Sequence, residues 1–363
     1  MPGPKANELE VSVFGPGYGE SILIHIGNNS WIVVDSCIDE SKQPAPLKYL
    51  KSIGVDVKTG VKLIVVTHWH DDHIRGISNV FRECETASIV FSAALTPKEF
   101  LTLAESYKSN PTLASTGIQE FSNIISMLGR KPDSFKFAAA DRILYRQAVT
   151  IDGSKKNIQI SALSPSDKNI EEAFHQVSKL IPKDGEKKIR LPTLNPNNVA
   201  VALWVQIGDE RILLGSDLEC DNSDTGNWTV IVNSSLLIDS KAFLFKVAHH
   251  GSPTSHNPLV WNRVLEPNVN AMLTPFVNGA NKLPSDDDLK RIAGFTKNIF
   301  VTSRPARRKY RHPDNAVQKR LEEMASNLFV ENGNFGHVKL RKEIDSDRDP
   351  EVELDGAAFQ FSS

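Results

Sequence analysis

The feature that most constrains this chain is a cluster of histidines and aspartates, HWHDDH, that begins at His68. It directly follows residues 62–66 (KLIVV), a β-branched run typical of a buried strand. Imidazole and carboxylate groups are the ligands that suit Zn²⁺ and neighbouring divalent ions. The chain holds only 10 histidines in 363 residues, so such clustering by chance is improbable. The cluster predicts a metal site in which His68 and His70 serve one ion and Asp72 and His73 a second.

Composition narrows the class of protein. Hydrophobic residues make up 40% of the chain, charged residues 24%, and the formal net charge is −2, as in a globular protein and unlike a disordered or collagen-like one. Three cysteines without a CxxC pair argue against a disulfide framework and against a thiolate zinc site. The first residues lack the apolar core of a signal peptide, and no apolar run approaches the ~20 residues of a membrane span. We therefore expect a cytoplasmic protein without membrane association.

The predicted elements form a strand-rich pattern that changes between residues 96 and 195. Strands are expected before, inside and after this stretch, at 11–14, 21–26, 31–34, 62–66, 143–151, 157–164, 199–207, 211–214, 243–247, 271–274 and 299–303. Helical spacing of apolar residues predicts helices at 97–107, 118–128, 171–180, 285–294 and 314–325. The chain length suggests two domains, and one large α/β domain remains open at this point.

The HxHxDH pattern after an apolar strand resembles the signature of the metallo-β-lactamase fold hydrolases. Further motifs of that family follow in the expected order: Asp35 closes the run VVDS, Asp217 closes LLGSD, and a histidine pair follows the strand at 243–247. The resemblance covers roughly residues 9–340. It implies an α/β fold, the αββα sandwich, with two sheets face to face, helices outside and metals at one edge.

This resemblance favours a single domain over residues 9–343 with a helical insertion at about 96–195. Residues 344–363 are acidic, contain Gly and Ser, and are expected to form a loose tail.

The resemblance also implies a set of metal ligands: His68, His70, Asp72, His73, Asp217 and His250. In the family, the aspartate at position 217 bridges two metals. Many members carry a further histidine about 20 residues earlier, where this chain has Asn198. Because a neutral amide is a weak ligand, the site fed by His68 and His70 is expected to bind its ion less tightly. One or two divalent ions, Zn or Mn, are therefore expected.

Further assignments follow from the same resemblance. Asp35 is expected to hydrogen-bond a ligand histidine from behind, with a simple turn carboxylate as the alternative. The adjacent His249 and His250 leave the last ligand open, and we favour His250 because it directly precedes a glycine. His249 would then support a ligand or face the substrate. Asp72 is a ligand that also orients the nucleophile, and His312 is a candidate proton donor or phosphate contact.

The particular residues of several motifs resemble those of one branch of the family. The runs GYGES at 17–21, NN at 197–198 and KVAHHGS at 246–252 resemble the hydrolase domain of bacterial competence DNA-uptake channel proteins and their stand-alone relatives. That branch also carries a His-Pro pair before a late helix, and His312 with the following proline resembles it.

A basic loop around position 308 bears on the substrate. Five cationic residues gather there next to a tyrosine: Arg304, Arg307, Arg308, Lys309 and Arg311. Such a cluster can neutralise phosphates, and an aromatic ring can stack on a base. A solvated basic loop is the alternative, because charge runs usually do no more than that.

These observations predict a metal-dependent hydrolase, a phosphodiesterase or nuclease that acts on nucleic acid or a nucleotide phosphodiester. A bound divalent ion lowers the pKa of its water to about 7 and so supplies the nucleophile. The rival enzyme reading is hydrolysis of a lactone, thioester or lactam, because fold alone cannot choose between these chemistries. A non-catalytic metal-binding module with a protein partner in a larger system is the third alternative.

Overall fold

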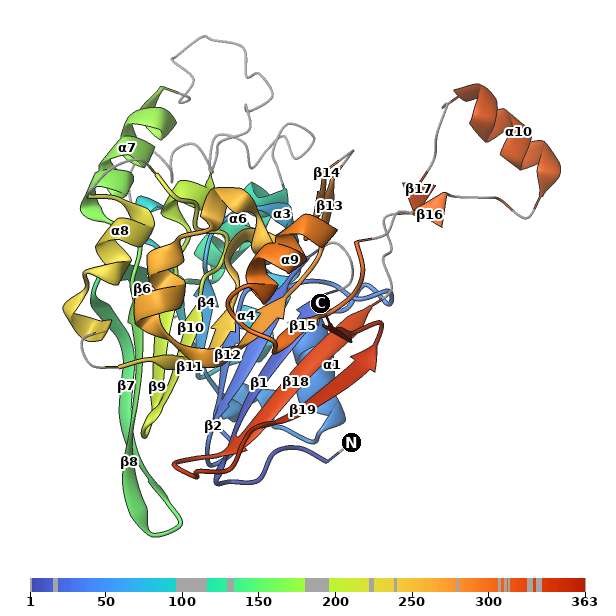
Figure 1. Cartoon of the computed structure of the whole chain (residues 1–363). Helices are drawn as coiled ribbons and strands as arrows, with labels where there is room; N and C mark the ends of the chain where they lie inside the picture. Colours follow the sequence, from blue (N-terminus) through green and yellow to red (C-terminus); the bar gives the residue numbers. More distant parts are fainter. Residues whose placement is uncertain are drawn as a thin grey trace.

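The computed structural model describes residues 2–15, 19–95, 116–128, 134–179, 196–221, 225–237, 240–278, 281–305, 308–309, 312, 314–324, 329–330 and 335–362 (Figure 1). Across these residues the chain forms two large sheets with helices on both outer sides (Figure 1). The αββα sandwich expected from the motifs is therefore confirmed.

The first sheet comes mainly from the N-terminal half of the chain. Its strands, in spatial order, are β19 (Glu351–Gly356), β18 (Gly336–Glu343), β1 (Glu8–Gly15), β2 (Ser21–Ile26), β3 (Trp31–Val34), β4 (Val61–Val66), β5 (Ser88–Ser92) and β6 (Phe135–Ala138). Strands β3 to β6 run parallel to one another, whereas β19, β18, β1, β2 and β3 pair antiparallel in succession.

The second sheet continues with the later strands. Its order is β20 (Phe359–Phe361), β15 (Ile299–Val301), β12 (Leu265–Leu273), β11 (Ala242–Lys246), β10 (Glu210–Leu214), β9 (Leu203–Ile207), β8 (Ser154–Ala162) and β7 (Arg142–Ile151). Strands β10, β11, β12 and β15 are parallel neighbours. Two small hairpins accompany the large sheets, β13 (Phe276–Asn278) with β14 (Asn281–Leu283) and β16 (Arg308–Lys309) with β17 (Phe329–Val330).

The apolar core divides into three layers, because strand side chains alternate between the two faces of a sheet. Leu9, Val11 and Val13 of β1 point between the two sheets and pack with residues of β9 and β10. The outer face of the first sheet packs against α1 (Ala45–Ser52), α2 (Val57–Gly60), α3 (Asp71–Ile74), α4 (Ile77–Glu83) and α6 (Thr116–Leu128). The outer face of the second sheet packs against α8 (Asn227–Val232) and α9 (Asp286–Ala293).

The stretch predicted as a helical insertion contributes to both sheets as well as to helices. Its described residues form α6 and α7 (Asp167–Ser178), close to the predicted helices, together with β6, β7 and β8. β6 extends the first sheet and β7 and β8 extend the second, so this stretch builds the sandwich itself. The helix predicted at 97–107 lies outside the described residues.

The prediction of a loose tail at residues 344–363 is wrong for its described part. β19 pairs with β18 over six residue pairs from Gly336↔Gly356 to Arg341↔Glu351, and β20 pairs with β15. The tail thus covers one edge strand in each sheet. Its acidic side chains do not prevent pairing, because Glu353 forms an ion pair with the buried Lys339 at 2.6 Å.

The basic loop leads into a separate part of the fold. β16, β17 and α10 (Asn315–Met324) project from the two-sheet body in Figure 1, and α10 has no buried residue. None of the described helices is long and apolar enough to cross a membrane.

Candidate metal centre

The carboxyl ends of parallel strands bring the predicted ligands to one edge of the sandwich. Asp35 directly follows β3, and residues 67–73 directly follow the parallel neighbour β4. In the other sheet, Asp217 follows β10, and His250 follows the parallel neighbour β11. Because parallel strands end at the same edge of a sheet, the ligands contributed by both sheets meet there.

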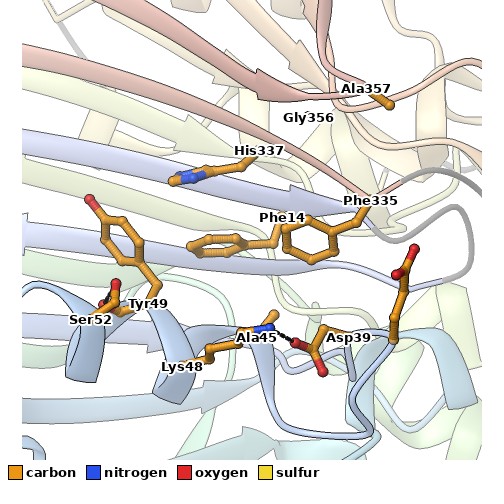
Figure 2. Close-up of a pocket in the computed structure, with 11 residues that line it drawn as sticks. Phe14, Asp39, Ala45, Lys48, Tyr49, Ser52, Phe335, His337, Gly356 and Ala357 are labelled. Atoms are coloured by element: carbon orange, nitrogen blue, oxygen red, sulfur yellow. Dashed lines mark hydrogen bonds and ion pairs between the residues drawn. The ribbon is translucent and has the colours of Figure 1, made fainter. Parts of the chain in front are cut away.

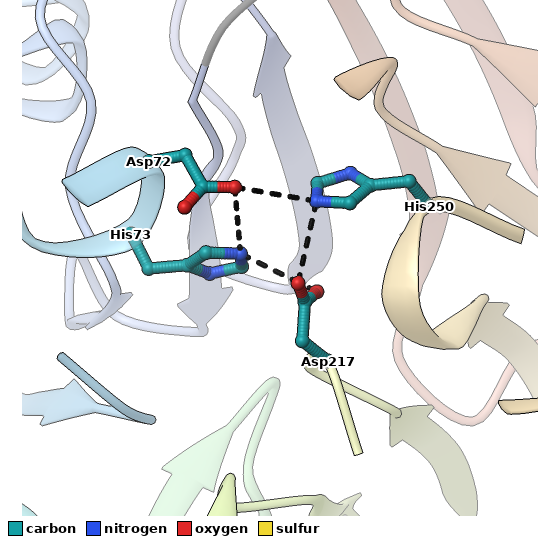
Figure 3. Close-up of side chains that lie close together, drawn as sticks. All are labelled: Asp72, His73, Asp217 and His250. Carbon is teal, nitrogen blue, oxygen red and sulfur yellow. Dashed lines mark ion pairs between the residues drawn. The ribbon is translucent and has the colours of Figure 1, made fainter. Parts of the chain in front are cut away.

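Four buried side chains form the first ligand group, Asp72, His73, Asp217 and His250 (Figure 3). His73 Nε2 lies 3.3 Å from Asp217 Oδ1 and 3.7 Å from Asp72 Oδ2. His250 Nε2 lies 3.4 Å from Asp217 Oδ2 and 3.5 Å from Asp72 Oδ2. Two imidazole nitrogens and two carboxylates thus face a common point, a mixed nitrogen and oxygen set that suits Zn²⁺ or Mn²⁺.

His68, His70 and Asp217 form a second group, whose ligand atoms lie within 4.8 Å of one another. The rings of His68 and His70 meet edge to face, with centroids 5.0 Å apart. Asp217 belongs to both groups, so its carboxylate could serve an ion in each. The structure therefore brings together all six of the predicted ligands.

Asp35 supports this edge from behind. Its carboxylate accepts hydrogen bonds from Thr67 N at 2.8 Å, from Thr67 Oγ1 at 2.7 Å and from His73 Nδ1 at 2.7 Å. Because His73 Nδ1–H is donated to a carboxylate, the Nε2 lone pair of His73 is left to face Asp217. Asp35 also lies within a third group with His68 and His73. Its bonds to Thr67 and His73 already occupy it as an orienting group.

Charge and burial oppose each other in the centre. Burial lowers the pKa of His73, but the carboxylates of Asp217 and Asp72 outweigh burial and hold this pKa well above its ordinary value. The same balance raises the pKa of His250 to about 9. Burial prevails at His68, whose pKa lies well below its ordinary value. The carboxylates therefore favour positive charge between His73 and His250, supplied either by protons or by a cation.

The donor set fits a divalent ion. His68 Nε2, His73 Nε2, His250 Nε2 and Asp217 Oδ1 are buried and have no hydrogen-bond partner among the described residues. Buried polar atoms are nearly always satisfied, so four such atoms facing one space indicate a ligand there. Imidazole and carboxylate are suitable ligands for that role.

The histidine pair separates into two roles. His250 joins the first ligand group, whereas His249 lies outside the three groups found among the described residues. His249 contacts Glu219 Oε1 at 3.2 Å through Nδ1 and the Asn197 amide at 3.3 Å through Nε2. Both histidines have positive φ, 48° and 53°, so the chain turns sharply here and points the two rings in different directions.

Asn198 is half-buried in a short 3₁₀ turn, Pro196–Val199. The neighbouring Asn197, to which the sequence analysis gave no role, is the amide that reaches His249. The only sequence signal for it was its place in the NN run.

Three further residues that sequence reasoning missed lie behind His250. They are a buried carboxylate, a buried ammonium and a hydroxyl: Glu20, Lys246 and Thr274. Glu20 and Lys246 belong to the sequence runs at 17–21 and 246–252. Their ion pair joins the two sheets, so local sequence spacing does not predict it.

The described members of the predicted substrate set make contacts outside the ligand groups. His312 contacts the start of α10: its backbone N–H donates to Gln318 Oε1 at 2.7 Å, and Asp314 N donates to its Nδ1 at 3.0 Å. Arg304 packs over the ring of Phe359, 4.8 Å from the centroid. The backbone of Arg308 and Lys309 forms β16. Arg307 and Arg311 lie outside the described residues.

A cavity of about 590 Å³ lies on the outer face of the first sheet, against α1 (Figure 2). Phe14, Tyr49, Phe335 and His337 supply its aromatic walls, and Lys48 pairs with Asp39 beside it. None of its lining residues belongs to the ligand groups found among the described residues, so it is separate from the metal centre.

Comparison with known protein families finds a similarity over part of the chain. Residues 14–158 match the sequence profile described as the Metallo-beta-lactamase superfamily. The search of curated proteins found no match.

Similar solved structures include the metallo-beta-lactamase fold protein YhfI from Bacillus subtilis, 14% identical, covering 81% of this chain and 95% of that chain, with a TM-score of 0.37. The CmlA beta-hydroxylase is 11% identical and covers 68% of this chain and 36% of that chain, with a TM-score of 0.33. Zn²⁺-bound PqqB from Methylobacterium extorquens is 10% identical and covers 63% of this chain and 57% of that chain, with a TM-score of 0.30. Over residues 14–158 the chain is thus similar to the metallo-beta-lactamase superfamily, whose members are mostly metal-dependent hydrolases, and its two-sheet fold agrees with that similarity.

Proposed function

We propose that this protein is a metal-dependent phosphodiesterase that cleaves nucleic acid or a nucleotide phosphodiester with one or two divalent ions, zinc or manganese. The observation that carries the proposal is the sharing of Asp217 between the two ligand groups. Two ions held ~3.5–4 Å apart suit in-line displacement at phosphorus, where attacking and leaving oxygens both need stabilisation.

When bound, divalent ions act as Lewis acids and lower the pKa of a coordinated water towards ~7. The residues of this chain supply the rest. Asp35 and Thr67 hold the ligand histidines in orientation, and Asp72 lies between His73 and His250, where it orients the attacking group. His249, with 18% of its side chain exposed and its Nδ1 3.2 Å from Glu219 Oε1, would donate a proton to the leaving oxygen.

The proposal of a phosphate substrate rests on the residues of several sequence motifs and on a cluster of positive charge. The runs at 17–21 and 246–252 and the His-Pro pair at 312 resemble the competence-protein branch, and cationic residues gather around Arg308. Lactone or thioester hydrolysis and a non-catalytic metal-binding module are the competing functions, which the same ligands would serve.

The test is a substrate panel with metal-stripped protein. The protein is reloaded with Mn²⁺, Zn²⁺ or Mg²⁺ and incubated with bis-p-nitrophenyl phosphate, single-stranded DNA, plasmid and RNA, and in parallel with a thioester and a lactone. We expect metal-dependent cleavage of a phosphodiester. Turnover confined to the thioester or lactone would reject the phosphodiesterase proposal, and no turnover in either class would favour the binding module.

The contribution of the predicted substrate residues is tested separately. His312→Ala and Arg304→Ala are expected to raise the KM for DNA and to leave hydrolysis of bis-p-nitrophenyl phosphate nearly unchanged. Asp287→Asn, whose side chain is 93% exposed on α9, is the control. Unchanged KM for DNA in both variants would show that the basic loop is a solvated surface.

A further inference from the structure

We propose that Glu20 is a positioning residue of the candidate metal centre, which holds the His250 ring through Thr274 with Nδ1 as the hydrogen-bond donor and connects the ligands of the two sheets. The inference rests on the metal-binding part of the proposed function and not on its substrate. It concerns residues to which the ligand assignments give no role.

The first step is a buried ion pair between the sheets. Glu20 directly precedes β2 of the first sheet, and Lys246 ends β11 of the second. Their side chains are 1% and 0% exposed, and Lys246 Nζ lies 2.6 Å from Glu20 Oε2. A buried ion pair is costly to form because both charges lose their hydration, so its presence is weak evidence for a stabilising role.

The second step is the direction of the hydrogen bonds. Thr274 Oγ1 donates its single proton to Glu20 Oε2. The same Oγ1 lies 2.9 Å from His250 Nδ1, and so it can only accept from that nitrogen. The carbonyl oxygen of Thr274, 3.1 Å away, accepts from Nδ1 as well. The Nδ1 of His250 therefore carries the proton, and its Nε2 lone pair faces Asp72 and Asp217.

The backbone of Glu20 makes a second contact with the ligand residues. Glu20 N–H donates to the carbonyl oxygen of Asp72 at 2.7 Å. This close approach requires a glycine before it: Gly19 has φ +115°, and a Cβ there would lie 2.8 Å from Cys37 Cβ and 3.2 Å from Asp72 O. Glu20 thus holds Asp72 through its main chain and His250 through its side chain.

His73 and His250 are consequently oriented by different means. His73 donates directly to the carboxylate of Asp35, whereas His250 donates to a hydroxyl that is itself polarised by Glu20. Partners of this kind typically change metal affinity ~10–100-fold when they are removed.

The test measures metal affinity and not turnover. Thr274→Val removes the hydroxyl at nearly constant volume, and Thr274→Ser restores it. Glu20→Gln combined with Lys246→Met removes both buried charges together, so that no unpaired ion remains. The matched control is Thr302→Val, because Thr302 is also fully buried after the neighbouring strand β15, and its hydroxyl has no hydrogen-bond partner within the described residues.

Each metal-free variant is titrated with Co²⁺ in competition with a chelator to measure its affinity. Visible absorption reports the geometry of the site. Thermal unfolding of the metal-free form reports the stability of the variant. We expect Thr274→Val and the double variant to weaken the first, tighter equivalent of Co²⁺ ~10–100-fold and to alter its spectrum. Thr274→Ser and Thr302→Val should bind Co²⁺ as the wild type does.

Wild-type affinity in Thr274→Val, or an equal loss in Thr302→Val, would overturn the proposal. A chain that shows the expected affinity pattern but cleaves no phosphodiester would reject the proposed function and leave this inference standing.

Discussion

At the scale of single residues, the centre depends on which imidazole nitrogen carries a proton. Asp35 settles this for His73 because it accepts from Nδ1 and from two donors of Thr67. Its backbone has φ 58°, so the carboxylate is held in a turn conformation that short polar residues tolerate.

Substitution of Asp35 tests this orientation. In Asp35→Asn the amide brings N–H donors to a position where both carboxylate oxygens accept hydrogen bonds. We expect a ~10–100-fold loss of metal affinity with a folded protein. Chelator competition measures the affinity, with Asp287→Asn as the control. Affinity equal to the wild type would mean that Asp35 is a simple turn carboxylate.

A second prediction concerns His337, which lines the cavity of Figure 2. Burial lowers its pKa to about 3, and its ring stacks on Phe14 with centroids 4.3 Å apart. An unfolded histidine has a pKa of ~6.5, so between pH 6.5 and about 3 the unfolded chain binds a proton that the folded chain does not. Above a pH of ~6.5 His337 does not affect the free energy of unfolding. Below it, the free energy of unfolding decreases as the pH falls towards about 3.

The measurement is urea unfolding of wild type and His337→Gln at several pH values between 7 and about 4.5. The free energy of unfolding of the wild type should fall more steeply with decreasing pH, by up to ~1.4 kcal/mol per pH unit. Parallel pH profiles would show that folding does not lower the pKa of His337.

The candidate ligands can be picked out from the sequence where the signal is local. The six candidate ligands stand in short motifs after strands, and the structure brings them together. The Glu20–Thr274 contact joins residues 254 positions apart, and only the packing of one sheet on the other creates it. Sequence spacing carries no information on such a pair.

At the scale of elements, strand ends decide where chemistry is placed. β3 with β4 and β10 with β11 are parallel pairs, and their carboxyl ends carry the ligands. Buried apolar strands of this kind are readable from sequence. The C-terminal tail was misjudged because β19 is an edge strand with mostly exposed, charged residues, which weakens the alternating pattern.

Removal of residues 347–363 tests the role of these edge strands. Val352 and Ala358 pack against the core between the sheets, and Phe359 and Phe361 against the outer core of the second sheet. Loss of these contacts is expected to lower the free energy of unfolding by at least ~2 kcal/mol. Urea denaturation of the shortened and full chains measures the difference. An unchanged midpoint would show that the tail contributes no packing.

At the scale of the whole molecule, the candidate metal centre lies where the two sheets meet. Asp72 and His73 follow the first sheet, Asp217 and His250 the second, and the Glu20–Lys246 pair crosses directly behind them. The fold class followed from motif order, since each ligand motif marks the end of a strand. The position of the basic loop could not be predicted from motif order, because a run of charged residues has no apolar face that fixes how it packs.

The central claim is that Asp217 joins two ion sites of unequal strength, the weaker formed with His68 and His70. Elemental analysis after titration of metal-stripped protein with Zn²⁺ or Mn²⁺ tests it most directly, with Asp217→Asn beside the wild type. We predict two equivalents with distinct affinities in the wild type and a loss of more than ~100-fold for both in Asp217→Asn, beyond what removal of an outer partner costs. Two equivalents of equal affinity would contradict the unequal sites, and unaltered binding in Asp217→Asn would contradict the shared carboxylate.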